Sequence, residues 1–129
     1  MADFGLSMAL LGAALATFLA GIGSAVGLGI AGRSATGVLS EKPERYGSTI
    51  LLVVLPSTQG IYGFVIAIMV MVKLNLFAGG TDINFTTGLE IFAACLPVAI
   101  AGLMSGIHQG KTCAGGILMT AKRPEMAFK

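Results

Sequence analysis

The residues best suited to chemistry lie in one stretch near the middle of the chain, around Pro56. A proline inside a helix removes a backbone donor and frees carbonyl oxygens, which matters most where no water can bond them. Four oxygen-bearing groups have the spacing i, i+3, i+4 and i+7, namely the Leu55 carbonyl and the side chains of Thr58, Gln59 and Tyr62. A helix places residues with this spacing on one side, so we predict a row of neutral oxygens there.

A further polar residue, Gln109, lies among glycines in the last apolar segment. Neutral hydroxyl and amide oxygens suit a hard monovalent cation, whereas zinc or copper would need clusters of His and Cys that the sequence lacks. We therefore predict an alkali ion or a proton as the cargo. The local chemistry also allows a second interpretation, in which Thr58, Gln59 and Gln109 only hydrogen-bond neighbouring helices.

The composition indicates that these residues lie in a membrane. Hydrophobic residues make up 55% of the chain, charged residues make up 11%, and the mean hydropathy is +0.89, which excludes a soluble domain. No charge lies between Asp3 and Arg33, between Arg45 and Lys73, or between Glu90 and Lys111. Each of these gaps can cross a bilayer, for which a helix needs about 20 residues. We predict an all-α membrane protein with three transmembrane helices.

The predicted helices span about residues 5–39, 46–76 and 85–121. The first two would form a helical hairpin over residues 1–76, closed by a short polar turn in which Pro43 ends the helix. Residues 85–129 would be the first helix of a second hairpin and the start of its loop. Cys95 and Cys113 lie in or beside the third helix without metal or redox spacing, so we predict that they are small packing residues.

An internal repeat supports the second hairpin. Lys42-Pro43-Glu44 after the first helix matches Arg123-Pro124-Glu125 after the third, and Ala20-Gly21-Ile22 matches Ser105-Gly106-Ile107. The third helix is therefore interpreted as a second copy of the first. The repeat implies a fourth helix, which the sequence does not contain, and we expect either an omitted C-terminal portion or a truncated form.

The basic residues predict the orientation in the membrane. Seven of the eight Lys and Arg residues flank the first turn or the end of the third helix: Arg33, Lys42, Arg45, Lys111, Lys122, Arg123 and Lys129. By the positive-inside rule, the turn between the first two helices and the C-terminal end are cytoplasmic, and the N-terminus lies outside the cell membrane. The net charge of +2 follows from this orientation and does not indicate nucleic-acid binding.

Small residues recur every four positions on the first and third predicted helices. The rows are Gly21, Ala25 and Gly29; Gly23, Gly27 and Ala31; and Gly102, Gly106 and Gly110. This spacing puts small residues on one helix face and lets neighbouring backbones approach closely. We predict tight helix packing in a ring of identical copies, with the first and third helices on the inside.

The sequence resembles the proteolipid (K or c) subunit of bacterial and archaeal V/A-type rotary ATPases over nearly its whole length. The resemblance rests on the two Pro-Glu loops and on two runs, Leu55-Pro56-x-Thr58-Gln59-Gly60-x-Tyr62-Gly63-Phe64 and Gly106-Ile107-x-Gln109-Gly110-Lys111. It implies a subunit with a fourth helix, in a ring that turns against a static membrane subunit with half-channels and contacts a central stalk. It also implies that Na⁺ or H⁺ crosses the bilayer as ATP is hydrolysed or made.

The resemblance implies roles for the polar residues. Leu55 by its carbonyl, Thr58, Gln59 and Gln109 would be Na⁺ ligands, and Tyr62 would hydrogen-bond an ionisable glutamate of the fourth helix. Among the acids present, Glu90 is the nearest alternative, but its sequence distance from Gln109 places it roughly 28 Å away along a helix. His108 points about 100° away from Gln109 around the helix and is predicted to pack or face lipid.

The predicted function is therefore a rotor-ring subunit that carries Na⁺, or alternatively H⁺. A proton needs only a carboxylate, and the additional oxygens of Thr58, Gln59 and Gln109 favour Na⁺. The sequence has no P-loop and no catalytic triad, so we predict no catalytic residue and no ATPase activity of its own. The alternative is a small oligomeric channel or a structural membrane subunit that uses the glycine rows only to assemble.

Overall fold

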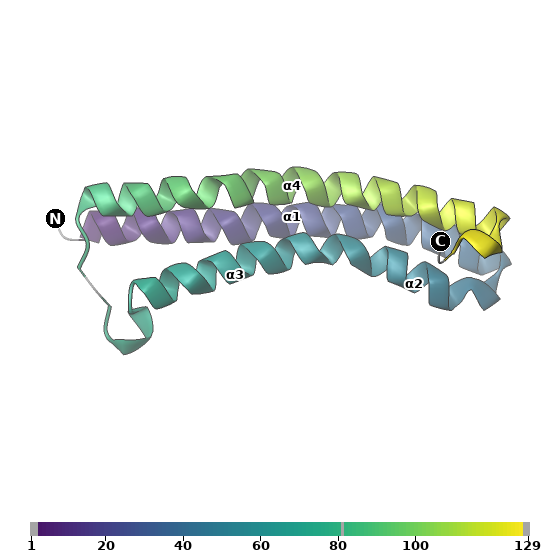
Figure 1. Cartoon of the computed structure of the whole chain (residues 1–129), viewed down its shortest axis with the longest axis horizontal. Helices are drawn as coiled ribbons and strands as arrows, with labels where there is room; N and C mark the ends of the chain where they lie inside the picture. The colour runs from purple at the N-terminus through teal and green to yellow at the C-terminus, as the bar shows by residue number, and fades with distance from the viewer. Residues whose placement is uncertain (1–2, 81, 128–129) are drawn as a thin grey trace.

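The structure is a computed structural model that describes residues 3–80 and 82–127, and three long helical segments run side by side in it (Figure 1). They are α1 (Asp3–Glu41), a middle segment made of α2 (Tyr46–Val54), η2 (Leu55–Ser57) and α3 (Thr58–Lys73), and α4 (Phe85–Lys122). All three are long and apolar enough to cross a membrane. The described residues contain no strand. The prediction of an all-α protein with three long apolar helices is confirmed.

The middle segment ends earlier than the sequence predicted, at Lys73 rather than near Leu76. Asn75 adopts the left-handed conformation with φ 54°, which terminates the helix, because a left-handed residue cannot continue a right-handed turn. A 3-10 turn, η3 (Leu76–Ala78), follows. On the far side of the loop the Asn84 side chain accepts a hydrogen bond of 2.8 Å from the Thr87 amide and caps α4.

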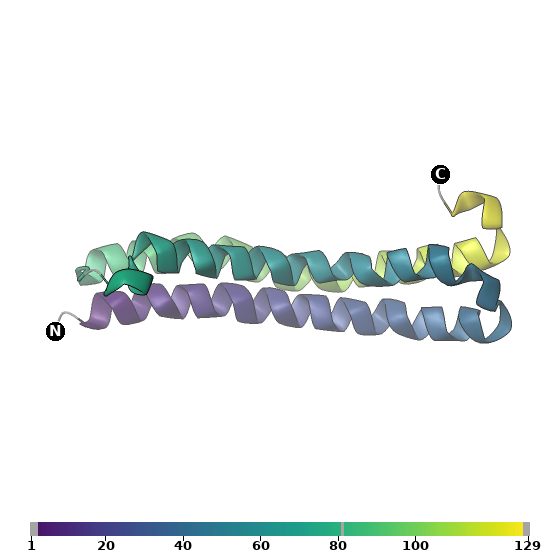
Figure 2. The same ribbon diagram turned by 90° about the horizontal axis from the view of Figure 1, so that it is seen from below.

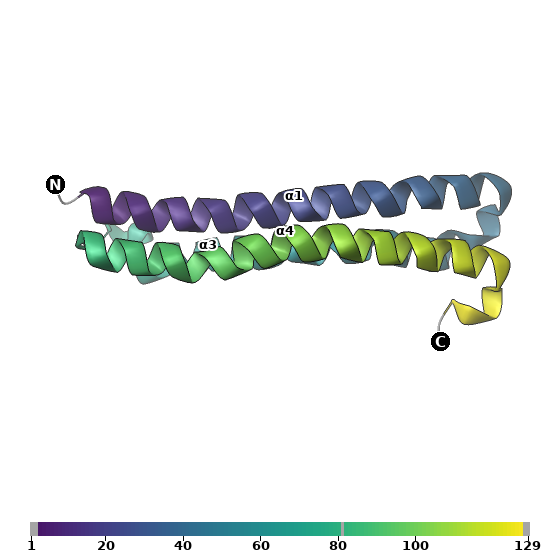
Figure 3. The same ribbon diagram turned by 90° about the horizontal axis from the view of Figure 1, so that it is seen from above.

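α1 and α4 lie next to each other along their lengths, with α3 behind them in Figure 3. Glycine makes this approach possible, because a Cβ added at Gly106 would lie 2.5 Å from the Gly23 carbonyl carbon, closer than real Cβ atoms come. A Cβ at Gly23 would collide in the same way with the backbone of Gly102 and Leu103. Around Gly23 and Gly106 the α1–α4 interface is therefore a contact of backbone on backbone.

The two rows of small residues on α1 have different surroundings. Gly23, Gly27 and Ala31 are buried, and a Cβ at Gly27 would meet the Gly106 carbonyl of α4. Gly29 is exposed, and a Cβ there would meet nothing within 4 Å. The row of Gly23, Gly27 and Ala31 packs inside the chain. In the other row Ala25 and Gly29 are exposed, and Gly21 is half-buried.

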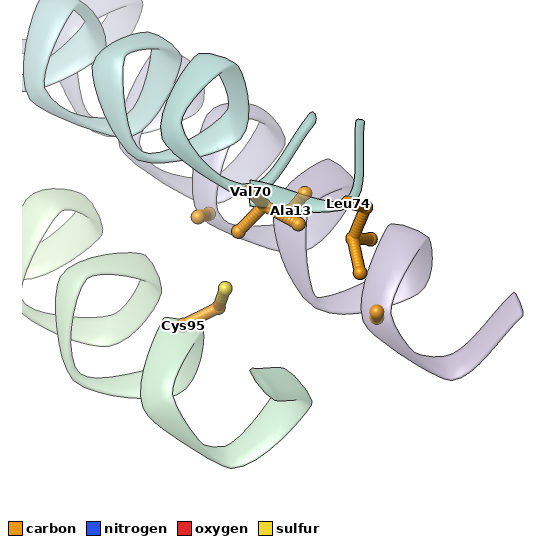
Figure 4. Close-up of a cluster of buried hydrophobic side chains, with 6 residues drawn as sticks. Ala13, Val70, Leu74 and Cys95 are labelled. Atoms are coloured by element: carbon orange, nitrogen blue, oxygen red, sulfur yellow. The ribbon is translucent and has the colours of Figure 1, made fainter. Parts of the chain in front are cut away.

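The hydrophobic core near the N-terminal end joins all three segments. Figure 4 shows the Cys95 thiol of α4 pointing toward Ala13 of α1 and toward Val70 of α3, with Leu74, just after the end of α3, in the same cluster. Cys95 is 1% exposed, and it is a free thiol. Cys113 belongs to a second cluster nearer the other end, so both cysteines lie in packed apolar surroundings.

The two Pro-Glu turns lie at the same end of the molecule (Figures 1 and 2) and have the same conformation. Lys42 has φ −134° and ψ 69° before η1 (Pro43–Arg45), and Arg123 has φ −130° and ψ 86° before η4 (Pro124–Met126). In each turn the amide three residues after the proline donates to the proline carbonyl. The Lys42 ammonium also donates to the Ala121 carbonyl at 2.6 Å, which ties the first turn to the end of α4.

Candidate functional site

The site begins at the break in the middle segment. Pro56 is buried, and the chain from Leu55 to Ser57 follows a 3-10 path between two α-helices. In the view of Figure 1 the middle segment is bowed toward α1 around this break. The proline therefore determines where the helix bends and which turn is presented to the neighbouring helices.

Two of the predicted ligand oxygens are brought together at the break. The Leu55 carbonyl accepts from the Thr58 amide and also from the Thr58 hydroxyl, at 3.1 Å. Because the hydroxyl donates its proton to the carbonyl, its lone pairs remain available to a cation. The two oxygens are close enough to contact the same ion.

The two glutamines meet across the helices. The Gln59 side-chain nitrogen of α3 donates to the Gln109 side-chain oxygen of α4 at 3.1 Å, and both side chains are half-buried. The Gln59 oxygen and the second lone pair of the Gln109 oxygen remain free to accept or to coordinate. The structure thus joins residues that are 50 positions apart in the sequence into one polar cluster.

This cluster opens onto a surface of the chain. Tyr62 lies one helical turn beyond Thr58 and Gln59, is 57% exposed, and has no hydrogen-bond partner among the described residues. Leu55 is 44% exposed on the same side. The oxygen cluster therefore lies toward an exposed face of the chain.

The two alternative titratable residues, Glu90 and His108, both lie on α4. Glu90 is exposed in the first turns of α4 and, with Lys73, lines an apolar groove between α3 and α4 whose volume is about 640 Å³. His108 is exposed next to Gln109, and its backbone carbonyl accepts from the Thr112 hydroxyl. Within residues 3–80 and 82–127, no group of three or more His, Cys, Asp or Glu residues is placed to hold a metal ion.

The sequence interpretation missed one residue of the site, Ser24 of α1. Its buried hydroxyl donates to the Pro56 carbonyl at 2.7 Å and accepts from the Gly60 amide at 2.8 Å. About two turns earlier on α1, the Thr17 hydroxyl bonds the Gly63 carbonyl of α3 at 3.2 Å. In the sequence, Ser24 is noticeable as a hydroxyl residue among the glycines and alanines of α1. The sequence does not reveal, however, which helix that hydroxyl faces.

The long apolar helices, with a cluster of oxygen-bearing groups beside a helix break, are those of a membrane-spanning protein. Comparison with known proteins agrees, because residues 11–70 and 92–129 match the family of the ATP synthase C subunit. The chain belongs to this family.

Three relatives show the breadth of the family. The chain is 45% identical to the V-type sodium ATPase subunit K of Enterococcus hirae, over 97% of this chain and 77% of the relative. It is 42% identical to the A-type ATP synthase subunit K of Methanocaldococcus jannaschii, over 82% of this chain and 44% of that protein. Identity to the 16 kDa proteolipid of the V-type proton ATPase of Homo sapiens is 28%, over 92% of this chain and 73% of the relative.

Proposed function

We propose that this chain is the ion-carrying subunit of the rotor ring of a V/A-type rotary ATPase, and that its cargo is Na⁺. The single observation that carries the proposal is the oxygen cluster at the Pro56 break, where Thr58 and Gln59 of α3 lie beside Gln109 of α4. The names of the relatives support it, since one is a subunit of a sodium ATPase and another of an ATP synthase. ATP hydrolysis or synthesis itself belongs to other subunits.

The ligand set we propose for Na⁺ contains the Leu55 carbonyl, the Thr58 hydroxyl and the oxygens of Gln59 and Gln109. These are neutral oxygens, which suit a hard cation of low charge. The Gln59–Gln109 bond is also what simple helix adhesion would produce, so the ion must be tested directly. Neutral ligands alone do not compensate the charge of Na⁺ in a bilayer, and the site needs one carboxylate.

We place that carboxylate on a glutamate of a fourth helix, held by the exposed Tyr62 hydroxyl. The repeat supports a fourth helix, since the turn at Pro124 has the conformation of the turn at Pro43, and α2 follows the latter directly. Residues 1–76 would then be one hairpin and residues 85–129 the beginning of the second. The fourth helix would cover the groove between α3 and α4 that Val70 and Cys95 help to line.

The ring is proposed from the outward small-residue row of α1. Gly21 and Gly29 leave room for a neighbouring backbone, and a second copy of the chain would fill it. The Pro-Glu turns would face the cytoplasm and contact the central stalk, as the basic residues there indicate. A static membrane subunit would load and empty each site through half-channels, and the bound Na⁺ would neutralise the carboxylate while it passes through lipid.

The test is ion protection in the ring assembled from the native subunit. A carbodiimide reagent labels only a protonated carboxylate, so millimolar Na⁺ should slow the labelling at fixed pH if Na⁺ occupies the site. Gln59→Ala and Gln109→Ala should weaken the protection more than they weaken ring assembly. If Na⁺ gives no protection at any pH while acid still raises the reactivity, the ring carries protons, and the glutamines serve only helix adhesion.

A further inference from the structure

Ser24 of α1 lies inside the helical turn that carries the proposed ligands. In an uninterrupted α-helix the Gly60 amide would donate to the Pro56 carbonyl, four residues before it. Here the Ser24 hydroxyl stands between these two groups, accepting from the Gly60 amide at 2.8 Å and donating to the Pro56 carbonyl at 2.7 Å. The side chain of one helix has thus been inserted into the hydrogen-bond ladder of another, which is a recognised cause of helix bending.

The turn bridged in this way contains Ser57, Thr58 and Gln59. Its width determines how far the Thr58 hydroxyl and the Gln59 amide lie from each other and from Gln109 on α4. A direct bond from Gly60 to Pro56 would draw the turn together, and the inserted hydroxyl keeps it open. Ser24 therefore contacts the backbone on both sides of the ligands, through one hydrogen bond that it accepts and one that it donates.

The surroundings of Ser24 fix its position. The residue is 6% exposed, in a row of α1 that packs against α3 and α4. Gly60 has no side chain in the way, and a Cβ there would lie 3.3 Å from the Ser24 hydroxyl oxygen. The core of a bilayer contains no water that could replace the hydroxyl. Without Ser24, the Gly60 amide and the Pro56 carbonyl would have to bond each other or remain unpaired, which is costly in an apolar medium.

We infer that Ser24 is a positioning residue for the ion site: its hydroxyl holds the turn from Pro56 to Gly60 open and thereby sets the spacing of the Thr58 and Gln59 oxygens that bind the cargo. The inference rests on the proposed function. Ser24 does not touch the ion and acts through the backbone. Groups that orient ligands in this way commonly change metal affinity by roughly 10-fold to 100-fold when they are removed.

The experiment measures binding of radioactive Na⁺ and of competing Li⁺ to rings purified from the native subunit. Ser24→Ala should bind Na⁺ at least roughly tenfold more weakly, with the same number of sites per ring. The ratio of Li⁺ to Na⁺ affinity should also change, since ligand spacing sets the preferred ion. Thr17→Val is the matched control, because it removes the other α1 hydroxyl that bonds the backbone of α3, at Gly63, outside the ligand turn.

The outcomes separate the inference from the proposed function. If the unsubstituted ring binds no Na⁺, both are overturned. If the unsubstituted ring binds Na⁺ and the Ser24→Ala ring binds Na⁺ and Li⁺ as tightly as it does, the inference alone is overturned. The inference alone is also overturned if Thr17→Val weakens Na⁺ binding as much as Ser24→Ala does. Should Ser24→Ala not assemble, Ser24→Cys keeps the side-chain volume with a weaker hydrogen-bonding group. A Ser24→Cys ring with weak Na⁺ binding supports the inference, and normal binding or failed assembly overturns it.

Discussion

The two faces that α1 presents to its neighbours are built in different ways. Toward α4 the contact is made by glycines such as Gly23 and Gly106, whose backbones touch without side chains between them. Toward the middle segment the contact includes the hydroxyls of Thr17 and Ser24, which bond backbone atoms of the opposite helix. The glycine contact contains no side chain that could move aside, whereas the contact with the middle segment contains a proline break and individual hydrogen bonds. We call α1 and α4 together the frame, and most of the proposed ligands lie on the middle segment, with Gln109 added from α4.

We expect the largest loss of stability from placing a bulky side chain between α1 and α4. Gly106→Leu places a side chain against the Gly23 backbone, which cannot yield as a flexible side chain could, and we expect a loss of about 3 kcal/mol or more. The amount of subunit extracted intact from membranes in mild detergent should fall sharply. Gly115→Leu is the control on the same helix, since a Cβ at Gly115 meets nothing within 4 Å. Equal yields of the two variants would show that the frame is not where we place it.

A smaller and more selective effect is expected on the outward row of α1. Gly29→Leu meets no atom of its own chain, so the subunit should fold and insert normally. The ring should fail to form, because the new side chain occupies the space assigned to a second copy. Native mass spectrometry of detergent extracts would distinguish monomer from ring. If Gly29→Leu formed a ring of normal size, this row would not be part of the subunit interface.

The sequence predicted much of this comparison but not its assignment to faces. Uncharged gaps indicated the spans, and the four-residue spacing indicated two small-residue rows on α1, because both are local properties. Which row meets α4 depends on how α1 is rotated about its axis, and only packing determines that. The partner of Ser24 could not be predicted for the same reason. The proposed ligands on the middle segment share a face by their spacing, but the Gln59–Gln109 bond joins distant segments.

A third prediction addresses the face that carries the site. Thr58→Val keeps the shape of the side chain and removes the hydroxyl, so Na⁺ affinity should fall roughly tenfold while the ring still assembles. Ser57→Ala is the control in the same turn, because the Ser57 hydroxyl bonds the Val54 carbonyl and lies outside the predicted row of oxygens. Protection against carbodiimide as a function of Na⁺ concentration gives the affinity. Equal affinities for the two variants would contradict the assignment of Thr58 as a ligand.

The smallest effect is expected at the end of the frame, where Lys42 bonds the Ala121 carbonyl. Lys42→Met removes an exposed charged hydrogen bond, and we expect a loss of less than about 1 kcal/mol. The temperature at which the ring dissociates in detergent should decrease slightly and depend on salt. Lys122→Met, also exposed at this end, is the comparison. A large decrease for Lys42→Met would mean that the turn contributes more to the frame than its exposure indicates.

The two similar Pro-Glu turns bear on the evolutionary origin of the chain. If the two hairpins arose by duplication of one gene segment, Ser24 and Gln109 are counterparts, since each follows a Gly-Ile pair at the same distance, Gly21-Ile22 in one copy and Gly106-Ile107 in the other. Both side chains reach the same turn of the middle segment, Ser24 at its backbone and Gln109 at the Gln59 side chain. One ancestral position would then have diverged into a short side chain that bonds the backbone of the turn and a long one that bonds a side chain of it.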